Sequence, residues 1–142
     1  MTFYLYSKLQ PATLIGLIFM PGDEPELKRH DLTPVNEFLQ CSVLPLQKHQ
    51  TFKPHKHISI EKTTNIAQES WVVLKGSVSV IWYDIDDSIL QELTIPEGGL
   101  AITFRGGHNY RCLSDSAIVY EFKTGPYWGQ KLDKEFLGVK NG

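Results

Sequence analysis

Residues 69–84 read ESWVVLKGSVSVIWYD, and this stretch decides the fold class. Two runs rich in β-branched and aromatic residues, Ser70–Leu74 and Val78–Tyr83, flank the turn signal Lys75–Gly76. Similar short runs recur at intervals of about 8 to 12 residues without a linker, which is typical of an all-β sandwich or barrel. One short helix is expected near Thr33–Phe38, after an N-cap threonine. Further strands are predicted at Leu14–Phe19, Phe38–Leu44, His55–Ile60, Ile89–Thr94, Leu100–Phe104, Tyr110–Leu113 and Ala117–Lys123.

Length and composition restrict the class of protein. The chain has 142 residues, which suits a single domain. Its 14 Lys and Arg against 16 Asp and Glu give a net charge of -2, which argues against a nucleic-acid partner or an acidic membrane surface. The 2 cysteines suggest neither a disulfide framework nor a thiolate zinc site. Residues 12–20, ATLIGLIFM, are too short to span a bilayer and lack signal-peptide flanks, so we expect a buried strand and a cytoplasmic protein.

Three histidines are spaced as metal ligands would be. On a strand, His55 and His57 project to the same face, so their imidazoles can converge on one point. His108 follows a Gly-rich turn and begins a strand that could return beside the first, while Glu61 and Glu69 lie between them in the sequence. Three imidazoles and one carboxylate suit one divalent transition metal, whether Fe, Mn, Ni, Co or Zn, and leave positions open for water or substrate.

These residues resemble the two motifs of the cupins, which are small β-barrels of the jelly-roll type. The first motif has H-x-H, a spacer, a glutamate, six residues and a glycine, as His55–His57, Glu69 and Gly76 do here. The second has a glycine, a turn and a histidine, as Gly98–Gly99 and His108 do. The segments FKPHKH, WVVLKGSVSVIWYD and VYEFKTGPYWGQKLDKEF are similar to small metal-binding cupins encoded among surface-polysaccharide biosynthesis genes. The resemblance covers about residues 38–136.

The resemblance implies a single-domain all-β cupin barrel with little helix. Residues 1–37 would be an N-terminal segment that packs on the barrel and covers an edge, residues 38–136 the barrel, and residues 137–142 a tail. It implies a metal-dependent enzyme of isomerase, epimerase or oxygenase type, acting on a small carbohydrate-like or acidic metabolite inside the barrel. The alternatives are a sugar-binding cupin without turnover and a metal-free isomerase that uses His and Tyr as acid and base. A homodimer is also expected, because cupins of this size commonly pair.

Two glutamates compete for the carboxylate position. Eleven residues separate His57 from Glu69, which is more than the cupin motif has, so Glu61 fits the short spacing and Glu69 fits the spacing to Gly76. We favour Glu69 as the ligand, because its strand places the carboxylate on a defined face two positions from Trp71. Glu61 then becomes the candidate general base, with the role of alternative ligand kept open.

Three further side chains are candidates for binding substrate. The guanidinium of Arg105 could meet a carboxylate or phosphate at the mouth of the barrel. Trp71 and Tyr110 offer aromatic faces on which a sugar ring could stack. His30 and His49 lie in polar stretches and are expected at the surface, apart from the metal site.

Overall fold

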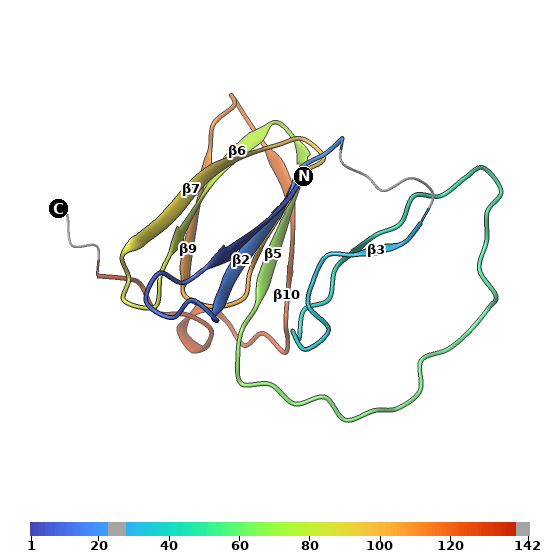
Figure 1. Ribbon diagram of the computed structural model, residues 1–142, viewed down its shortest axis with the longest axis horizontal. Helices are drawn as coiled ribbons and strands as arrows, with labels where there is room; N and C mark the ends of the chain where they lie inside the picture. Colours follow the sequence, from blue (N-terminus) through green and yellow to red (C-terminus); the bar gives the residue numbers. More distant parts are fainter. Residues whose placement is uncertain (23–27, 139–142) are drawn as a thin grey trace.

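The computed structural model describes residues 1–22 and 28–138, and this part of the chain is almost entirely β (Figure 1). Its strands are β1 (Thr2–Tyr6), β2 (Leu14–Phe19), β3 (His30–Asp31), β4 (Ser42–Val43), β5 (Glu69–Lys75), β6 (Ser77–Tyr83), β7 (Ile89–Pro96), β8 (Leu100–Thr103), β9 (Gly107–Cys112) and β10 (Ile118–Lys123), followed by the 3-10 turn η1 (Gln130–Leu132). Within the described ranges, no helix has the length and apolar character needed to cross a bilayer.

Two antiparallel sheets pack face to face. The larger has the order β1-β2-β8-β5-β10 and the smaller has the order β7-β6-β9, while β3 and β4 form a separate two-stranded ribbon. At the β5–β6 turn, Gly76 has a φ of 77°, and a Cβ there would lie 2.4 Å from the carbonyl oxygen of Ser116. Only glycine fits this turn without strain. The all-β prediction is confirmed, whereas the two sheets do not join into a closed barrel within the described residues.

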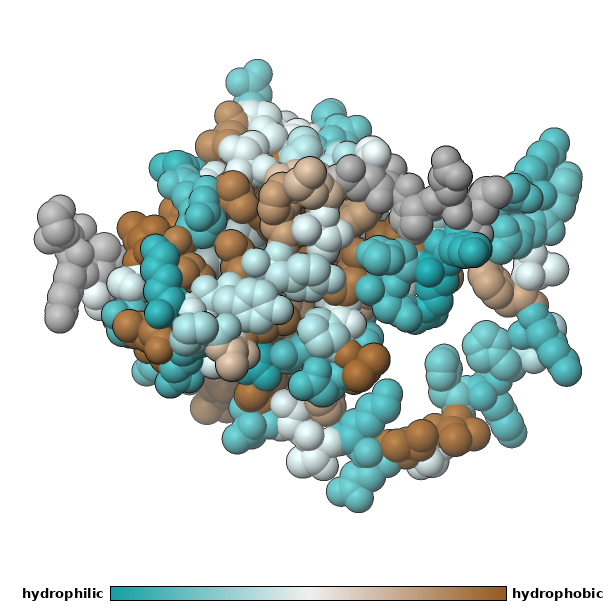
Figure 2. Space-filling model, in the orientation of Figure 1, coloured by the Kyte–Doolittle hydropathy of each residue, from teal (hydrophilic) through white to brown (hydrophobic). Residues whose placement is uncertain are grey.

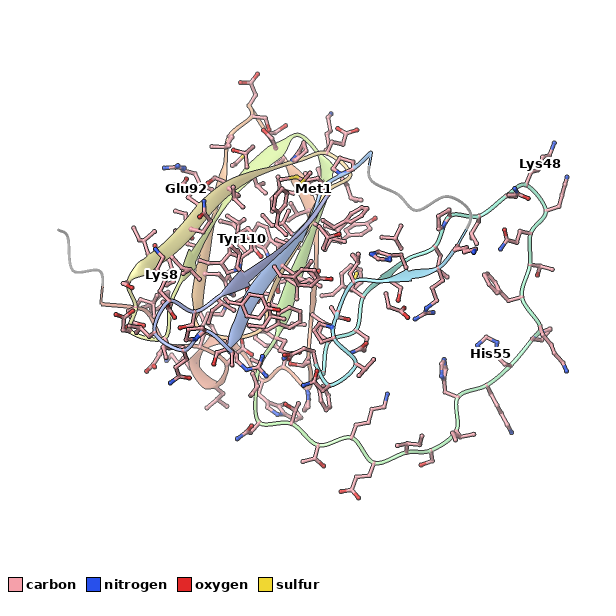
Figure 3. The ribbon with its side chains drawn as sticks, in the orientation of Figure 1. Met1, Lys8, Lys48, His55, Glu92 and Tyr110 are labelled. Atoms are coloured by element: carbon pink, nitrogen blue, oxygen red, sulfur yellow. The ribbon has the colours of Figure 1, made fainter. Side chains whose placement is uncertain are left out.

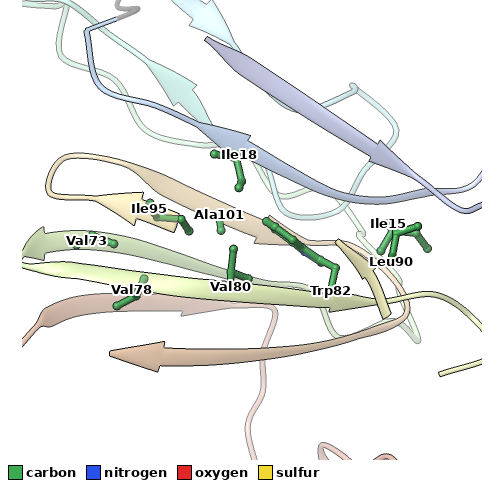
Figure 4. Packing of buried hydrophobic residues seen from close by; sticks show 9 residues of the cluster. All are labelled: Ile15, Ile18, Val73, Val78, Val80, Trp82, Leu90, Ile95 and Ala101. Atoms are coloured by element: carbon green, nitrogen blue, oxygen red, sulfur yellow. The ribbon is translucent and has the colours of Figure 1, made fainter. Parts of the chain in front are cut away.

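The facing sides of the two sheets enclose the main core (Figure 4). The buried members of this cluster are Ile15, Ile18, Val73, Val78, Val80, Trp82, Leu90, Ile95 and Ala101. Trp82 is the largest of them, and its indole Nε1 donates a hydrogen bond to Thr103 Oγ1 at 3.1 Å. Each large apolar side chain buried in this way stabilises the fold by about 1.5–3 kcal/mol. The cluster therefore fixes the positions of the strands that carry the site described below.

A second apolar cluster covers the outer face of the larger sheet. It comprises Leu14, Leu17, Phe19, Leu32, Leu100, Ile102 and Phe104, with Leu39, Cys41, Val43 and Val72 packed against it. The segment from Leu32 to Val43 therefore serves as a cover for this sheet. The helix predicted near Thr33–Phe38 is wrong, since these residues form turns and bends. The Thr33 hydroxyl, expected to cap a helix, instead accepts a hydrogen bond from the backbone N–H of Cys41 at 3.0 Å.

The predicted strands differ in outcome. The strand at Leu14–Phe19 and those predicted between residues 70 and 123 are confirmed, with ends that shift by a few residues. The prediction at Phe38–Leu44 holds only for Ser42–Val43, and β1 and β3 were not predicted. The strand predicted at His55–Ile60 is wrong: residues 44–67, here called the arm, contain no strand and stand away from the sheets (Figures 1 and 2). A strand needs a neighbouring strand whose N–H and C=O groups form hydrogen bonds with its own backbone, and the arm has no such neighbour in the described chain.

Candidate functional site

A cavity of about 720 Å³ lies where β5, β9 and β10 come together. Polar and aromatic side chains from both sheets form its walls, among them Glu69, Trp71, Thr103, His108, Tyr110, Glu121 and Lys123. Residues of the C-terminal segment, from Gln130 to Leu137, complete the lining. A concave site with a few convergent polar groups is the usual form of a small-molecule site.

Glu69 and His108 form the central pair of this cavity. Glu69 Oε1 lies 3.1 Å from His108 Nε2, and the two side chains are only 10% and 23% exposed. The indole N–H of Trp71 donates to the same carboxylate oxygen at 3.1 Å, and Lys123 Nζ lies 3.5 Å from the other oxygen. Burial opposes ionisation of Glu69, but the hydrogen bond with His108, the charge of that imidazole when it is protonated, and Lys123 lower the pKa of this carboxyl to about 2. Glu69 is therefore an anion at neutral pH and holds the imidazole in place.

Tyr110 brings an unpaired hydroxyl to the same cavity. Its ring stacks on Trp71 with centroids 3.8 Å apart, and it meets the His108 ring edge-on at 5.4 Å. The buried phenolic oxygen forms no hydrogen bond of regular geometry within the described chain, although the Thr103 hydroxyl, which accepts from the Trp82 indole, lies close enough to oppose the rise of the Tyr110 pKa. Burial, and then the negative charge of Glu69, raise the pKa of Tyr110 above its ordinary value. The phenol is thus protonated at neutral pH and available to donate to a ligand.

The arm carries the other predicted ligands away from this cavity. His55 and His57 are exposed, and their ring centroids lie 5.7 Å apart, with His55 Nδ1 at 3.0 Å from the carbonyl oxygen of Lys53. Figure 3 shows His55 on the arm, on the opposite side of an open space from Tyr110, which lies among the strands. Glu61 is also exposed on the arm. The structure therefore brings together Glu69 and His108 but places His55, His57 and Glu61 elsewhere.

The predicted metal site does not fit an ion in this arrangement. Among residues 1–22 and 28–138, no group of three or more His, Cys, Asp or Glu side chains is placed to hold one. Glu69 and His108 supply two donors, whereas protein sites for transition metals usually supply three or four. We therefore derive no chemical step through a metal, and the ligand set of His55, His57, Glu69 and His108 stays a prediction.

Arg105 lies at the cavity wall but is engaged with a buried carboxylate. Its Nη1 is 2.7 Å from Glu37 Oε1, and the Glu37 side chain is 6% exposed. Gln68 Nε2 donates to the other oxygen of Glu37 at 2.7 Å. This network joins the cover segment to the turn before β9. The contact of Arg105 with substrate stays a prediction, because one side of its guanidinium already has a protein partner.

Sequence reasoning missed the cation of the cavity. Lys123 Nζ lies 2.9 Å from Glu121 Oε1 and 3.8 Å from Asp133 Oδ2, and it sits 4.4 Å from the centroid of the Tyr127 ring. The hydrogen bond to Glu121 is the main cause that raises the pKa of Lys123. The alternation along β10 could have placed Glu121 and Lys123 on the face they share, but nothing in the sequence marks that face as a cavity wall.

Comparison with known proteins gives no match for this chain. No protein-family model, no curated protein and no solved structure matches the chain. The chemistry of the cavity is therefore inferred from its own residues.

Proposed function

We propose that the protein is an enzyme that moves protons on a small, polar, carbohydrate-like molecule bound in the cavity, as an isomerase or epimerase does. The observation that supports this proposal is the Glu69–His108 pair beside the buried, unpartnered hydroxyl of Tyr110. The carbohydrate class follows from the resemblance to cupins of surface-polysaccharide biosynthesis, and a cupin jelly roll and a cytoplasmic location belong to the same proposal.

His108 supplies the base. An ionised carboxylate can only accept hydrogen bonds, so Glu69 fixes the proton of His108 on Nε2. The other ring nitrogen, Nδ1, then carries a lone pair that can take a proton from a carbon next to a carbonyl group. Glu69 stabilises the imidazolium that forms, as a carboxylate does in other His-based catalytic pairs.

Tyr110 supplies the acid. Its phenol stays protonated because of burial and the charge of Glu69. A hydroxyl or carbonyl oxygen of the substrate that reaches this phenol gives it the hydrogen bond that it lacks in the described chain. The donor then stabilises negative charge that develops on that oxygen when His108 removes the proton. The base and the acid come from the same strand, two positions apart, so their spacing is set by the strand itself.

Exchange of substrate protons with solvent tests this function. A panel of free and nucleotide-linked aldo and keto sugars is incubated with the protein in D2O, and deuterium incorporation is followed by NMR. We expect exchange at one carbon in the wild type and a loss of at least about 100-fold in His108→Gln and Tyr110→Phe, the scale of general acid–base catalysis. The exposed residues His30 and Tyr120 give matched controls, His30→Gln and Tyr120→Phe, which retain exchange. Saturable binding without exchange would instead assign a sugar-binding function.

A further inference from the structure

The walls of the cavity carry an excess of negative charge, since six of the side chains that line it are acidic and three are basic. The acidic ones are Glu69, Asp84, Asp87, Glu121, Asp133 and Glu135, and the basic ones are Arg105, Lys123 and Lys134. Arg105 adds no net positive charge, because it is paired with the buried Glu37. A concave wall with one sign of charge concentrates its field and attracts ligands of the opposite sign.

Three carboxylates of this wall converge on a single ammonium group. Lys123 Nζ lies 2.9 Å from Glu121 Oε1 and 3.5 Å from Glu69 Oε2. The third carboxylate, Asp133, has its Oδ2 at 3.8 Å from the same nitrogen. The Lys123 and Asp133 side chains are only 17% and 15% exposed, so water screens their charges weakly. One positive charge does not offset three negative ones, and the group stays negative even when His108 is protonated.

Asp133 is the least satisfied of the three carboxylates. Glu69 and Glu121 each accept a hydrogen bond from the indole N–H of Trp71 at 3.1 Å. Asp133 accepts no hydrogen bond in the described part of the chain, and Lys123 Nζ at 3.8 Å is beyond hydrogen-bond length. A mostly buried carboxylate without a donor costs free energy, and a ligand that donates to it removes that cost.

Aromatic rings lie next to these carboxylates. Trp71 and Tyr110 stack with their ring planes 3° apart, and both line the cavity. The indole N–H of Trp71 donates to both Glu69 and Glu121, so its ring is held within the acidic group. Aromatic rings offer apolar area to the carbon skeleton of a ligand, and they also attract a cation. The cavity therefore combines an aromatic wall with uncompensated negative charge.

We propose that the substrate of this cavity carries a protonated amine, as an amino sugar does, and that Asp133 and Glu121 bind the amine. An ammonium group has three donors, so it supplies the hydrogen bond that Asp133 lacks and offsets the excess charge. The same excess repels phosphate, which disfavours phosphorylated and nucleotide-linked sugars. Asp133 and Glu121 thus set specificity, while His108 and Tyr110 transfer the proton. The sugar framework of the ligand rests on the function proposed above, whereas its charge is inferred from the cavity itself.

Matched sugars test the charge of the ligand. Each of three configurations, gluco, galacto and manno, is presented as the 2-amino sugar, the parent hexose and the hexose 6-phosphate. The amino sugar and the parent hexose differ only in the amine that replaces one hydroxyl, and an alkyl amine is mostly protonated near neutral pH. Binding is followed by NMR through the indole N–H resonance of Trp71, assigned by comparison with Trp71→Phe. In at least one configuration we expect the amino sugar to bind about tenfold more tightly than the parent hexose, and the phosphate to bind more weakly than either.

Substitution of Asp133 tests its contact with the amine. Asp133→Asn keeps the size of the side chain and removes its charge, so affinity for the amino sugar should fall about tenfold more than affinity for the parent hexose. A general distortion of the cavity would weaken the binding of both sugars alike. Glu97→Gln, at an exposed position outside the cavity, should keep the wild-type preference. The preference of the wild type should also shrink as the salt concentration rises, a measurement that needs no variant.

Several results would overturn the inference. They are equal affinity for the amino sugar and the parent hexose, tighter binding of the phosphate, no binding by any of the sugars, and an unchanged preference in Asp133→Asn. Failure of the proton-transfer function is recognised separately, because the amino sugar then binds with the expected preference but shows no deuterium exchange. Conversely, exchange into the parent hexose without any preference for the amine would retain the function and refute the amine.

Discussion

Removal of the Glu69 charge should destabilise the fold at neutral pH but not in strong acid. The substitution Glu69→Gln keeps the size of the side chain and removes the anion that His108 and Lys123 face. The pKa of Glu69 is lowered from 4.5 to about 2 in the folded protein. A carboxyl whose folded pKa is depressed adds stability above its unfolded pKa and loses it as the pH falls through the folded value.

The magnitude follows from that difference. At about 1.4 kcal/mol per pH unit, a fall from 4.5 to about 2 corresponds to at most about 3 kcal/mol of stability at pH 7, the full value requiring a protonated His108. In the wild type this contribution declines as the pH falls from 4.5 to 2. Below that range the wild type no longer exceeds Glu69→Gln in stability. The carboxylate is only 10% exposed, so solvent screens its contacts weakly.

Urea unfolding monitored by tryptophan fluorescence at pH 7, 4.5, 3 and 2 measures the effect. The wild type should exceed Glu69→Gln by up to about 3 kcal/mol at pH 7, and the two curves should converge at about pH 2. The control Glu61→Gln, on the exposed arm, should follow the wild type throughout. A constant difference between wild type and Glu69→Gln at all four pH values would show that packing or hydrogen bonding, and not charge, makes Glu69 important.

Three other substitutions test the core, the buried ion pair and the cavity. Ile95→Ala removes a fully buried side chain between the sheets and should lower the free energy of unfolding by about 3 kcal/mol in urea titrations. Glu37→Gln leaves Arg105 without its carboxylate partner and should lower the free energy of unfolding by about 1–3 kcal/mol. The double variant Glu37→Gln, Arg105→Met should not show this loss, because no unpaired charge remains. Tyr110→Phe removes a buried hydroxyl without a partner and should raise the melting temperature of the ligand-free protein, whereas Tyr120→Phe should leave it unchanged.

Local patterns account for the parts of the fold that the sequence predicted. Strands β5 and β6, which lie in different sheets, could be anticipated because two apolar runs flank a glycine whose positive φ the turn requires. The buried strand at Leu14–Phe19 was equally clear, since an apolar run of strand length is hidden on both faces, by the main core and by the cover segment. In each case the information lies within a few residues.

The parts that failed depend on distant partners. The segment His55–Ile60 alternates as a strand does, but its pattern does not specify an acceptor edge, and none within the described chain pairs with it. The predicted ligands also depend on distant partners. Glu69 and His108 meet because β5 and β9 line one cavity, whereas the spacing of His55 and His57 along the chain fixes only how these two side chains lie relative to each other. The cavity cation Lys123 was missed for a similar reason, since its neighbours come from β5 and the C-terminal segment.

Two side chains of the cavity, Glu69 and Tyr110, differ in the number of polar groups that contact them. This difference bears on the function. Glu69 contacts Trp71, His108 and Lys123, so its charge is compensated by the protein itself. Tyr110 is partly buried with its hydroxyl oxygen enclosed, yet this oxygen forms no hydrogen bond of regular geometry within the described residues. Phenylalanine would fill the same space on Trp71 without the cost of an unsatisfied hydroxyl. If a ligand completes the hydrogen bond of this hydroxyl, as the proposed function requires, Tyr110→Phe should both gain stability and lose proton exchange.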